Sequence, residues 1–251
     1  MILEIAGLTK RFGGITAVDD MHLSVAAGEI HAVVGPNGSG KTTLFNLISG
    51  AVPVTAGQIS FEGRRIDALP PHRRAQLGIT RTFQNIKLFP DLNVLENVLV
   101  GQHSVSNTGV GSLVRWWGAQ ERMQREKAMD LLRAFGLQDI AMRQAGELAY
   151  GPKRLVEIAR AVASGPRLLL LDEPTSGMNA RESGEMVQAI RKAAGRKMTV
   201  LIIEHHLPVV KDLAERVTVL NFGRKISEGT PAAVFGDPAV VEAYLGGSGD
   251  E

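Results

Sequence analysis

The sequence predicts an α/β fold, and three observations support that prediction. The apolar, β-branched run Ile30–Val34 leads into a glycine-rich loop, and a helical pattern then continues as far as Gly50. Beyond residue 164, strands and helices alternate again, and the strands are as apolar as those of a sheet buried on both faces. Between these parts, residues 95–148 have a helical periodicity, which indicates an inserted helical segment.

Composition limits the classes of protein to consider. A chain of 251 residues can form one large α/β domain, or a core with a smaller subdomain. Its net charge of +2 is too small to indicate a nucleic-acid partner or an anionic membrane surface. The absence of cysteine suits a cytosolic protein. We find no secretory signal and no apolar stretch near the roughly 20 residues of a spanning helix, so at a membrane we expect another chain to cross it.

Short runs near the N-terminus predict a small antiparallel sheet beside the glycine loop. Residues 3–8 and 21–25 alternate between apolar and polar side chains, residues 58–63 form another strand-like run, and turn residues separate the three. Phe12 lies within this sheet. If the loop binds a nucleotide, this ring either stacks on adenine or packs in the core, and we favour stacking because aromatic rings pack well on bases.

The glycine loop is the most specific motif in the chain. Residues 35–42, with the sequence GPNGSGKT, match the phosphate-binding pattern G-x-x-x-x-G-K-[ST] at every fixed position. In such a loop the backbone N–H groups close around phosphate oxygens, and the start of the following helix adds positive potential. Lys41 supplies a point charge and Thr42 offers a hydroxyl to Mg²⁺. The loop therefore predicts binding of a nucleoside triphosphate.

The middle of the chain carries helical and irregular segments. Residues 128–135 contain an apolar helical stripe that ends at Gly136, whereas residues 104–118 are rich in Gly, Ser and Asn and predict a loop or irregular insertion. Trp116 and Trp117 could anchor the protein at a membrane interface or pack within the helical segment. We favour packing, because no basic amphipathic helix surrounds them.

A second group of polar residues follows the apolar strands of the second half. The leucines at 168–171 lead directly into Asp172 and Glu173, whose side chains alternate in direction. Asp172 is the candidate to hold Mg²⁺, and Glu173 is then free to polarise an attacking water. A surface acidic pair is the alternative, but a buried strand ending at carboxylates favours catalysis.

Further elements complete the second half. The strand at 199–203 ends near His205, which could donate to a γ-phosphate or be an ordinary surface histidine. Residues 189–194 predict a helix, 217–221 and 225–229 predict a hairpin, and 239–245 predict a C-terminal helix before a disordered tail.

The segment 147–163 predicts a helix whose start forms a second anion site. Pro152 follows Gly151, which places the proline at the first helical position, where its missing N–H costs little. An exposed helix N-terminus attracts anions. If the two anion sites lie on separate subdomains, two copies facing head to tail could present both to one phosphate.

Taken in order, these motifs resemble those of the ATP-binding-cassette (ABC) ATPases, over essentially the whole chain. The resemblance implies a P-loop α/β core with an antiparallel β-subdomain at residues 1–94 and a helical subdomain at 95–163. It also implies a second part of the core at 164–235, followed by a C-terminal helix and tail at 236–251.

The resemblance also implies roles for individual residues. Phe12 would stack on adenine, and Gln84 would reach Mg²⁺ and the attacking water and sense the membrane partner. Glu173 would act as the base, and His205 would contact the γ-phosphate. The signature segment Leu148–Gly151, which contains Tyr150 and Gly151, would close on the ATP of the other subunit. The phosphates would be held by Asn37, Gly38, Ser39, Gly40, Lys41, Thr42 and Thr43, and Mg²⁺ by Thr42, Gln84 and Asp172.

Softer motifs at 101–103, 107–109, 157–160 and 242–246 are similar to one subgroup, the ATP-binding subunit of branched-chain amino-acid importers. That subgroup implies a head-to-tail dimer with a paralogue or a second copy, transmembrane permease subunits, indirectly a solute-binding protein, and a place on the cytoplasmic face of the inner membrane. Other solutes (urea or amides), lipopolysaccharide export and a non-transport regulatory ATPase stay open. A ribosome- or DNA-associated cassette fits less well, because such proteins usually carry two cassettes or a long coiled-coil insertion and neither appears here. A GTPase fits less well because the N-K-x-D motif is absent, and a P-loop kinase would lack the Tyr-Gly segment at residues 150–151.

Three positions depart from the family pattern. Ala149 replaces a serine, Pro152 replaces a glutamine, and Asn179 replaces an aspartate. Each lost neutral hydrogen bond is worth about 0.5–1.5 kcal/mol, so we expect weakened hydrolysis rather than none.

Overall fold

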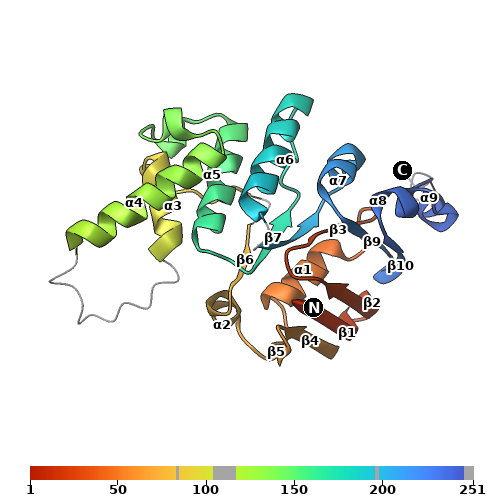
Figure 1. Ribbon diagram of the computed structural model, residues 1–251. Helices are drawn as coiled ribbons and strands as arrows, with labels where there is room; N and C mark the ends of the chain where they lie inside the picture. The colour runs from red at the N-terminus through yellow and green to blue at the C-terminus, as the bar shows by residue number, and fades with distance from the viewer. Residues whose placement is uncertain (83–84, 104–116, 196–197, 246–251) are drawn as a thin grey trace. The chain divides into compact units, whose positions relative to one another are not determined.

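The structure is a computed structural model, and it describes residues 1–82, 85–103, 117–195 and 198–245 (Figure 1). The chain divides into two compact units. The first unit contains Met1–Arg81, Arg167–Ser176 and the chain from Arg196 onward, and the second contains Thr82–Pro166 and Gly177–Gly195. Each unit is described separately below.

The first unit is built on a six-stranded sheet in the order β10-β9-β3-β8-β7-β6. The strands β6, β7, β8, β3 and β9 run parallel, and β10 pairs antiparallel with β9. Every residue of β3, β7 and β8 is buried, which is why these strands are apolar throughout. The bounds are β3 Ile30–Val34, β6 Ile79–Arg81, β7 Leu168–Asp172, β8 Thr199–Ile203, β9 Arg216–Asn221 and β10 Arg224–Gly229.

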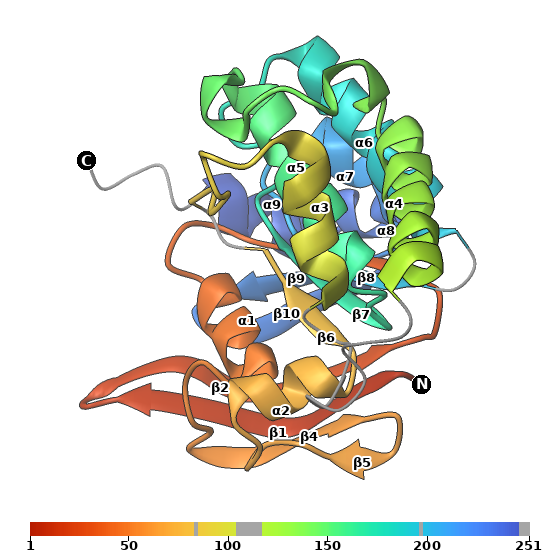
Figure 2. The same cartoon turned by 90° about the vertical axis from the view of Figure 1, so that its left-hand side faces the viewer.

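A second, four-stranded antiparallel sheet in the order β2-β1-β4-β5 belongs to the same unit, as predicted. Its strands are β1 Leu3–Phe12, β2 Ile15–Val25, β4 Ala56–Phe61 and β5 Arg64–Arg65. The first two are longer than predicted, because register shifts after Ile5 interrupt the simple alternation without ending the pairing. Helix α1, Lys41–Ser49, packs its buried face between the two sheets (Figure 2).

Four shorter helices complete the first unit: α2 Pro71–Gln76, α7 Leu207–Leu213, α8 Pro231–Phe235 and α9 Pro238–Leu245. The predicted C-terminal helix is thus α9, one residue longer than expected. The predicted hairpin is β9–β10, and the tail that we expected to be disordered lies outside the described residues.

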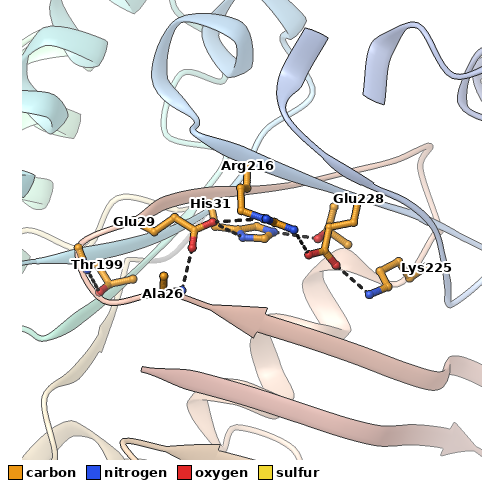
Figure 3. Close-up of polar contacts among 9 residues, drawn as sticks. Ala26, Glu29, His31, Thr199, Arg216, Lys225 and Glu228 are labelled. Atoms are coloured by element: carbon orange, nitrogen blue, oxygen red, sulfur yellow. Dashed lines mark hydrogen bonds and ion pairs between the residues drawn. The ribbon is translucent and has the colours of Figure 1, made fainter. Parts of the chain in front are cut away.

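Polar contacts tie the start of β3 to β9, and β9 to β10 (Figure 3). The His31 ring, fully buried, hydrogen-bonds through Nδ1 to Glu29 Oε1 at 2.9 Å and through Nε2 to Thr218 Oγ1 at 2.8 Å. Arg216 donates to Glu228 at 2.7 Å. The ring therefore joins the start of β3 both to the residue before the strand and to the neighbouring strand β9, which fixes the end of β3 that lies away from the phosphate loop.

The second unit is helical in its described part. It consists of α3 Val94–His103, α4 Trp117–Ala134, α5 Tyr150–Ala163 and α6 Ala180–Ala194, with 3-10 turns at Gln138–Ile140 and Ala145–Glu147. Ala128, Leu132 and Phe135 of the predicted stripe are buried. The prediction for α6 covered only residues 189–194, although Met186 and Val187 in the preceding part of the helix are also buried. The predicted insertion lies almost wholly outside the described residues, as does the packing of Trp116 and Trp117.

No helix in the described part of the chain combines the length and apolarity needed to cross a bilayer.

Candidate functional site

The phosphate loop lies between β3 and α1, in the strand–loop–helix context that the motif requires. Its backbone conformation needs glycine at two positions in particular. Gly35 has φ +150° and Gly40 has φ +102°, and an ideal Cβ atom would lie 2.1 Å from the Leu220 carbonyl oxygen and 2.4 Å from the Ala17 carbonyl oxygen, respectively. No side chain fits at these distances, so the neighbouring backbones set the shape of the loop.

Lys41 is buried and folded onto this loop. Its Nζ donates to the carbonyl oxygens of Gly35 and Pro36 at 2.8 and 2.7 Å. Burial lowers the pKa of Lys41 below its ordinary value, and the negative charges of Glu173 and Asp172 partly oppose this change. The ammonium is therefore held in the loop with two carboxylates nearby.

The other predicted phosphate-binding residues differ in exposure. Ser39 is buried, Gly40 and Thr43 are half-buried, and the exposed positions are Asn37, Gly38 and Thr42. The exposed residues are those that an arriving phosphate can reach first.

The predicted acidic pair lies at the end of β7. Arg81 in β6 donates to Asp172 Oδ2 at 2.8 Å and also to Asn46 Oδ1 in α1 at 2.6 Å. Asp172 is thus linked to the helix that follows the phosphate loop. Arg81 was missed in the sequence, although its position in a strand just before Gln84 was a usable signal.

Glu173 follows in an uncommon backbone conformation. Its φ is +46°, and its amide donates to the Ile203 carbonyl oxygen of β8 at 3.0 Å. A non-glycine residue in the left-handed region costs energy, and such residues concentrate at functional sites.

His205 lies beside Glu173, at the end of the neighbouring strand β8. Its Nδ1 is 3.8 Å from Glu173 Oε1, and the side chain is 56% exposed. Glu204, fully buried, accepts hydrogen bonds from the Thr175 amide at 3.1 Å and the His205 amide at 3.0 Å, and contacts the Thr175 hydroxyl. This carboxylate fixes the ends of β7 and β8 to each other, and so brings the two predicted side chains together.

Phe12 ends β1, and its ring is 47% exposed with Lys10 Nζ 4.8 Å from the ring centroid. The ring is therefore outside the buried core, and stacking on adenine stays a prediction. At the other end of the first unit, burial raises the pKa of Tyr244 in α9.

Tyr150 and Gly151 belong to the second unit, whereas the other described site residues belong to the first. Helix α5 begins at Tyr150 with Ala149 as its N-cap, so the prediction that Pro152 is the first helical residue is wrong. Pro152 is the third. The N–H groups of the whole first turn lack helical partners, so proline is tolerated there as well.

Asn179, one of the departures from the family pattern, is the N-cap of α6. Its Oδ1 accepts from the Glu182 amide, and the Glu182 carboxylate accepts from the Asn179 amide, both at 3.0 Å. This capping box was readable in the sequence as Asn followed by Glu three residues later. Gln84 lies outside the described residues.

Comparisons with known proteins agree with this arrangement. Residues 18–176 match the family described as "ABC transporter", and residues 224–250 match "Branched-chain amino acid ATP-binding cassette transporter". The chain is 41% identical to the high-affinity branched-chain amino acid transport ATP-binding protein BraF of Pseudomonas aeruginosa, and 39% identical to LivG of Escherichia coli, described in the same words. Each match covers 98% of both chains.

Solved structures extend the likeness to the fold. The ADP conformation of MJ1267, an ATP-binding cassette of an ABC transporter, is 34% identical with a TM-score of 0.85, covering 98% of each chain. A dimeric cassette in a post-hydrolysis state, bound to ADP and Pi, is 26% identical with a TM-score of 0.77, covering 91% of this chain and 98% of that one. The chain belongs to the ABC transporter family, as one of its ATP-binding and ATP-hydrolysing subunits.

Proposed function

We propose that this chain hydrolyses ATP to power an importer of branched-chain amino acids. The observation that carries the catalytic part is the convergence in the first unit of the phosphate loop, the acids that end β7 and the histidine that follows β8. The solute is supported by the names of the full-length relatives and by the C-terminal match at residues 224–250.

In the proposed site the loop from Asn37 to Thr43 holds the triphosphate. Lys41 leaves the carbonyl oxygens of Gly35 and Pro36 and binds the β- and γ-phosphates instead, since a phosphate offers the ammonium a stronger partner than a carbonyl. A nearby Mg²⁺ would be held by Thr42, Asp172 and Gln84 and would neutralise charge on those phosphates. A hydroxyl and a carboxylate fit this ion, which takes few protein ligands when phosphates supply the rest.

Glu173 is the proposed general base that orients and deprotonates the attacking water. His205, within ion-pair distance of Glu173, donates to the γ-phosphate. Its exposure leaves this ring accessible to a ligand, whereas the buried Glu204 beneath it keeps the backbone in place.

The proposed active form is a head-to-tail dimer with a paralogue or a second copy. Tyr150 and Gly151 at the start of α5 would face the ATP bound to the other subunit, through helix N-terminal N–H groups. The dimer would dock on transmembrane permease subunits at the cytoplasmic face of the inner membrane, with a solute-binding protein delivering the amino acid.

The test is ATP turnover with and without co-expressed permease subunits in vesicles, together with uptake of labelled leucine. We expect turnover to rise with the permease and uptake to depend on ATP. Turnover coupled to urea, an amide or lipopolysaccharide would replace the solute assignment. Turnover indifferent to protein concentration and to any membrane partner would remove the transport function.

A further inference from the structure

The turn between β9 and β10 touches the phosphate loop directly. The Gly223 amide donates to the Ser39 carbonyl oxygen at 3.0 Å, and the Gly223 carbonyl oxygen accepts from the Asp19 amide of β2 at 2.9 Å. An ideal Cβ at Gly40 would lie 3.5 Å from the Gly223 Cα atom. The phosphate loop, β2 and this turn therefore form one packed junction within the first unit.

A charged contact fixes the hairpin in this place. Arg224 donates to Asp19 Oδ2 through Nε at 2.8 Å and through Nη2 at 2.6 Å. Both contacts are exposed to solvent, so they contribute little to the free energy of folding and mainly fix the position of the hairpin. They hold Arg224, the residue that follows the turn, beside β2, and so support the position of the turn beside the loop.

The first residue of the turn is unusual for its position. Phe222 has φ +46° and Gly223 has φ +79°, the pattern of a two-residue turn in which both residues are left-handed. Asn, Asp or Gly is favoured at the first position, and a bulky residue there is a conformational outlier. The Phe222 side chain is also 86% exposed. Within the described chain, neither the strain nor the exposure is offset by burial of the ring.

We propose that Phe222 is a specificity residue that packs against the base of the nucleotide held by the phosphate loop. A nucleotide with its phosphates in the loop carries its flat aromatic base outward to the rim, where it can gain from aromatic contact. Phe222 precedes Gly223, whose amide donates to the Ser39 carbonyl oxygen of the phosphate loop. This inference rests on the proposed function, because it needs the loop to bind ATP or ADP.

Phe222 would contact the base in addition to Phe12, which is predicted to stack on it. Phe12 and Ile15 are partners across the turn between β1 and β2, and Ala17, two residues on, is the residue that approaches Gly40. Two separate hairpins therefore contact the loop through the backbone of Ala17 and Gly223, and each hairpin carries an exposed aromatic side chain. Contacts with the base from two segments of the chain can distinguish one nucleotide from another by the shape of the base. Contacts with the phosphates cannot, because the phosphates are the same in every nucleotide.

The experiment compares ADP with inorganic pyrophosphate, which keeps phosphates but lacks the base. Binding of each to the wild-type chain and to Phe222→Asn is measured by calorimetry. We expect the Kd for ADP to rise about 5- to 20-fold and the Kd for pyrophosphate to stay within about twofold. Since asparagine suits the turn, the Tm of the ligand-free variant is expected to rise by about 2–4 °C.

Two further variants serve as controls. Phe222→Tyr keeps a ring at the same position, so it should bind ADP as the wild type does. Phe89→Asn makes the same replacement at an exposed ring of the second unit and should leave binding of both ligands unchanged.

Each remaining outcome is decisive. An unchanged Kd for ADP in Phe222→Asn overturns the inference, and so does an equal loss of ADP and pyrophosphate, which would mean that the turn only shapes the loop. If ADP binding is unaffected and dimer formation or permease-coupled turnover falls instead, Phe222 contacts a protein partner and not the base. A wild-type chain that binds neither ADP nor ATP would defeat the proposed function itself.

Discussion

The phosphate loop and the start of α5 are both proposed to bind phosphate through backbone N–H groups, but the two segments are under different constraints. In the loop, Gly35 and Gly40 approach neighbouring carbonyl oxygens so closely that no side chain can be added. At the start of α5, the N-cap Ala149 makes no side-chain hydrogen bond, and Pro152 is accommodated three residues into the helix. A site built by tertiary contacts leaves its sequence little freedom, whereas a site built by a helix end tolerates exchange of its side chains.

The largest effect is expected from replacing Glu173. This replacement tests whether the catalytic base for ATP hydrolysis lies in the first unit, which also contains the phosphate loop. Glu173→Gln removes the proposed base and keeps the size of the side chain. We expect kcat to fall by about 10²- to 10⁴-fold while ATP still binds and a dimer accumulates. Single-turnover hydrolysis and size-exclusion chromatography measure this, with the helix-capping change Glu182→Gln as the control. Wild-type turnover in Glu173→Gln would show that another group is the base.

The constraint on the loop itself is tested by Gly40→Ala, whose Cβ would collide with the Ala17 carbonyl oxygen. With strain of about 1–3 kcal/mol added to that clash, we expect at least a ~100-fold loss of ATP affinity, read by calorimetry.

Gly38→Ala is the matched control for Gly40→Ala. Gly38 also has a positive φ, +77°, but an added Cβ would meet no atom within 4 Å. Only the backbone strain remains, so its loss of affinity should be clearly smaller. Equal losses in the two variants would mean that conformation, and not close approach, limits the loop.

A smaller effect is expected at low pH, where protonation of Glu29, just before strand β3, should lower the free energy of unfolding. Burial pushes the pKa of Glu29 upward, but the hydrogen bonds from His31 and the Ala26 amide, with the charge of Arg216, outweigh burial and hold it below its ordinary value. The folded-state pKa is lower than the unfolded one. Glu29 therefore stabilises the fold above its unfolded pKa, and that stability is lost as pH falls through the folded value.

Urea unfolding at a series of acidic pH values measures this loss. Glu29→Gln should make the free energy of unfolding less dependent on pH in that window, because the carboxylate no longer takes up a proton on unfolding. Glu4→Gln, an exposed change elsewhere in the first unit, is the control. An unchanged pH dependence in Glu29→Gln would show that other carboxylates control acid unfolding.

The smallest effects are expected at the start of α5 and α6. Ala149→Ser restores one hydroxyl donor, so ATP turnover should stay the same or rise by no more than about tenfold. Asn179→Asp exchanges two equally good N-caps, and the free energy of unfolding should change by only a few tenths of a kcal/mol. Steady-state turnover and urea unfolding measure the two. A large drop in turnover for Ala149→Ser would contradict the tolerance of this helix end.

The strands and the loop could be predicted because their local pattern and their burial coincide. Strands β3, β7 and β8 are buried along their whole length, so their apolar runs mark them almost to the residue. The first half of α6 was missed although its buried face, Ser183, Met186 and Val187, continues the face formed by Ala189 and Ile190; its first residues, Ala180 and Arg181, are exposed and give no apolar signal. The start of α5 was misplaced because proline is acceptable anywhere in a first turn, and a glycine–proline pair alone does not identify the N-cap.

By itself, the sequence determined the phosphate-binding loop, the buried parallel strands and the residue types that end them, because these depend on neighbours along the chain. The tertiary structure decided which strands lie side by side. That order brings His205 to Glu173, links Arg81 to Asp172, and places the turn at Phe222 against Ser39. These contacts join residues far apart in sequence through packing and hydrogen bonds, and no local pattern of residues encodes such pairings.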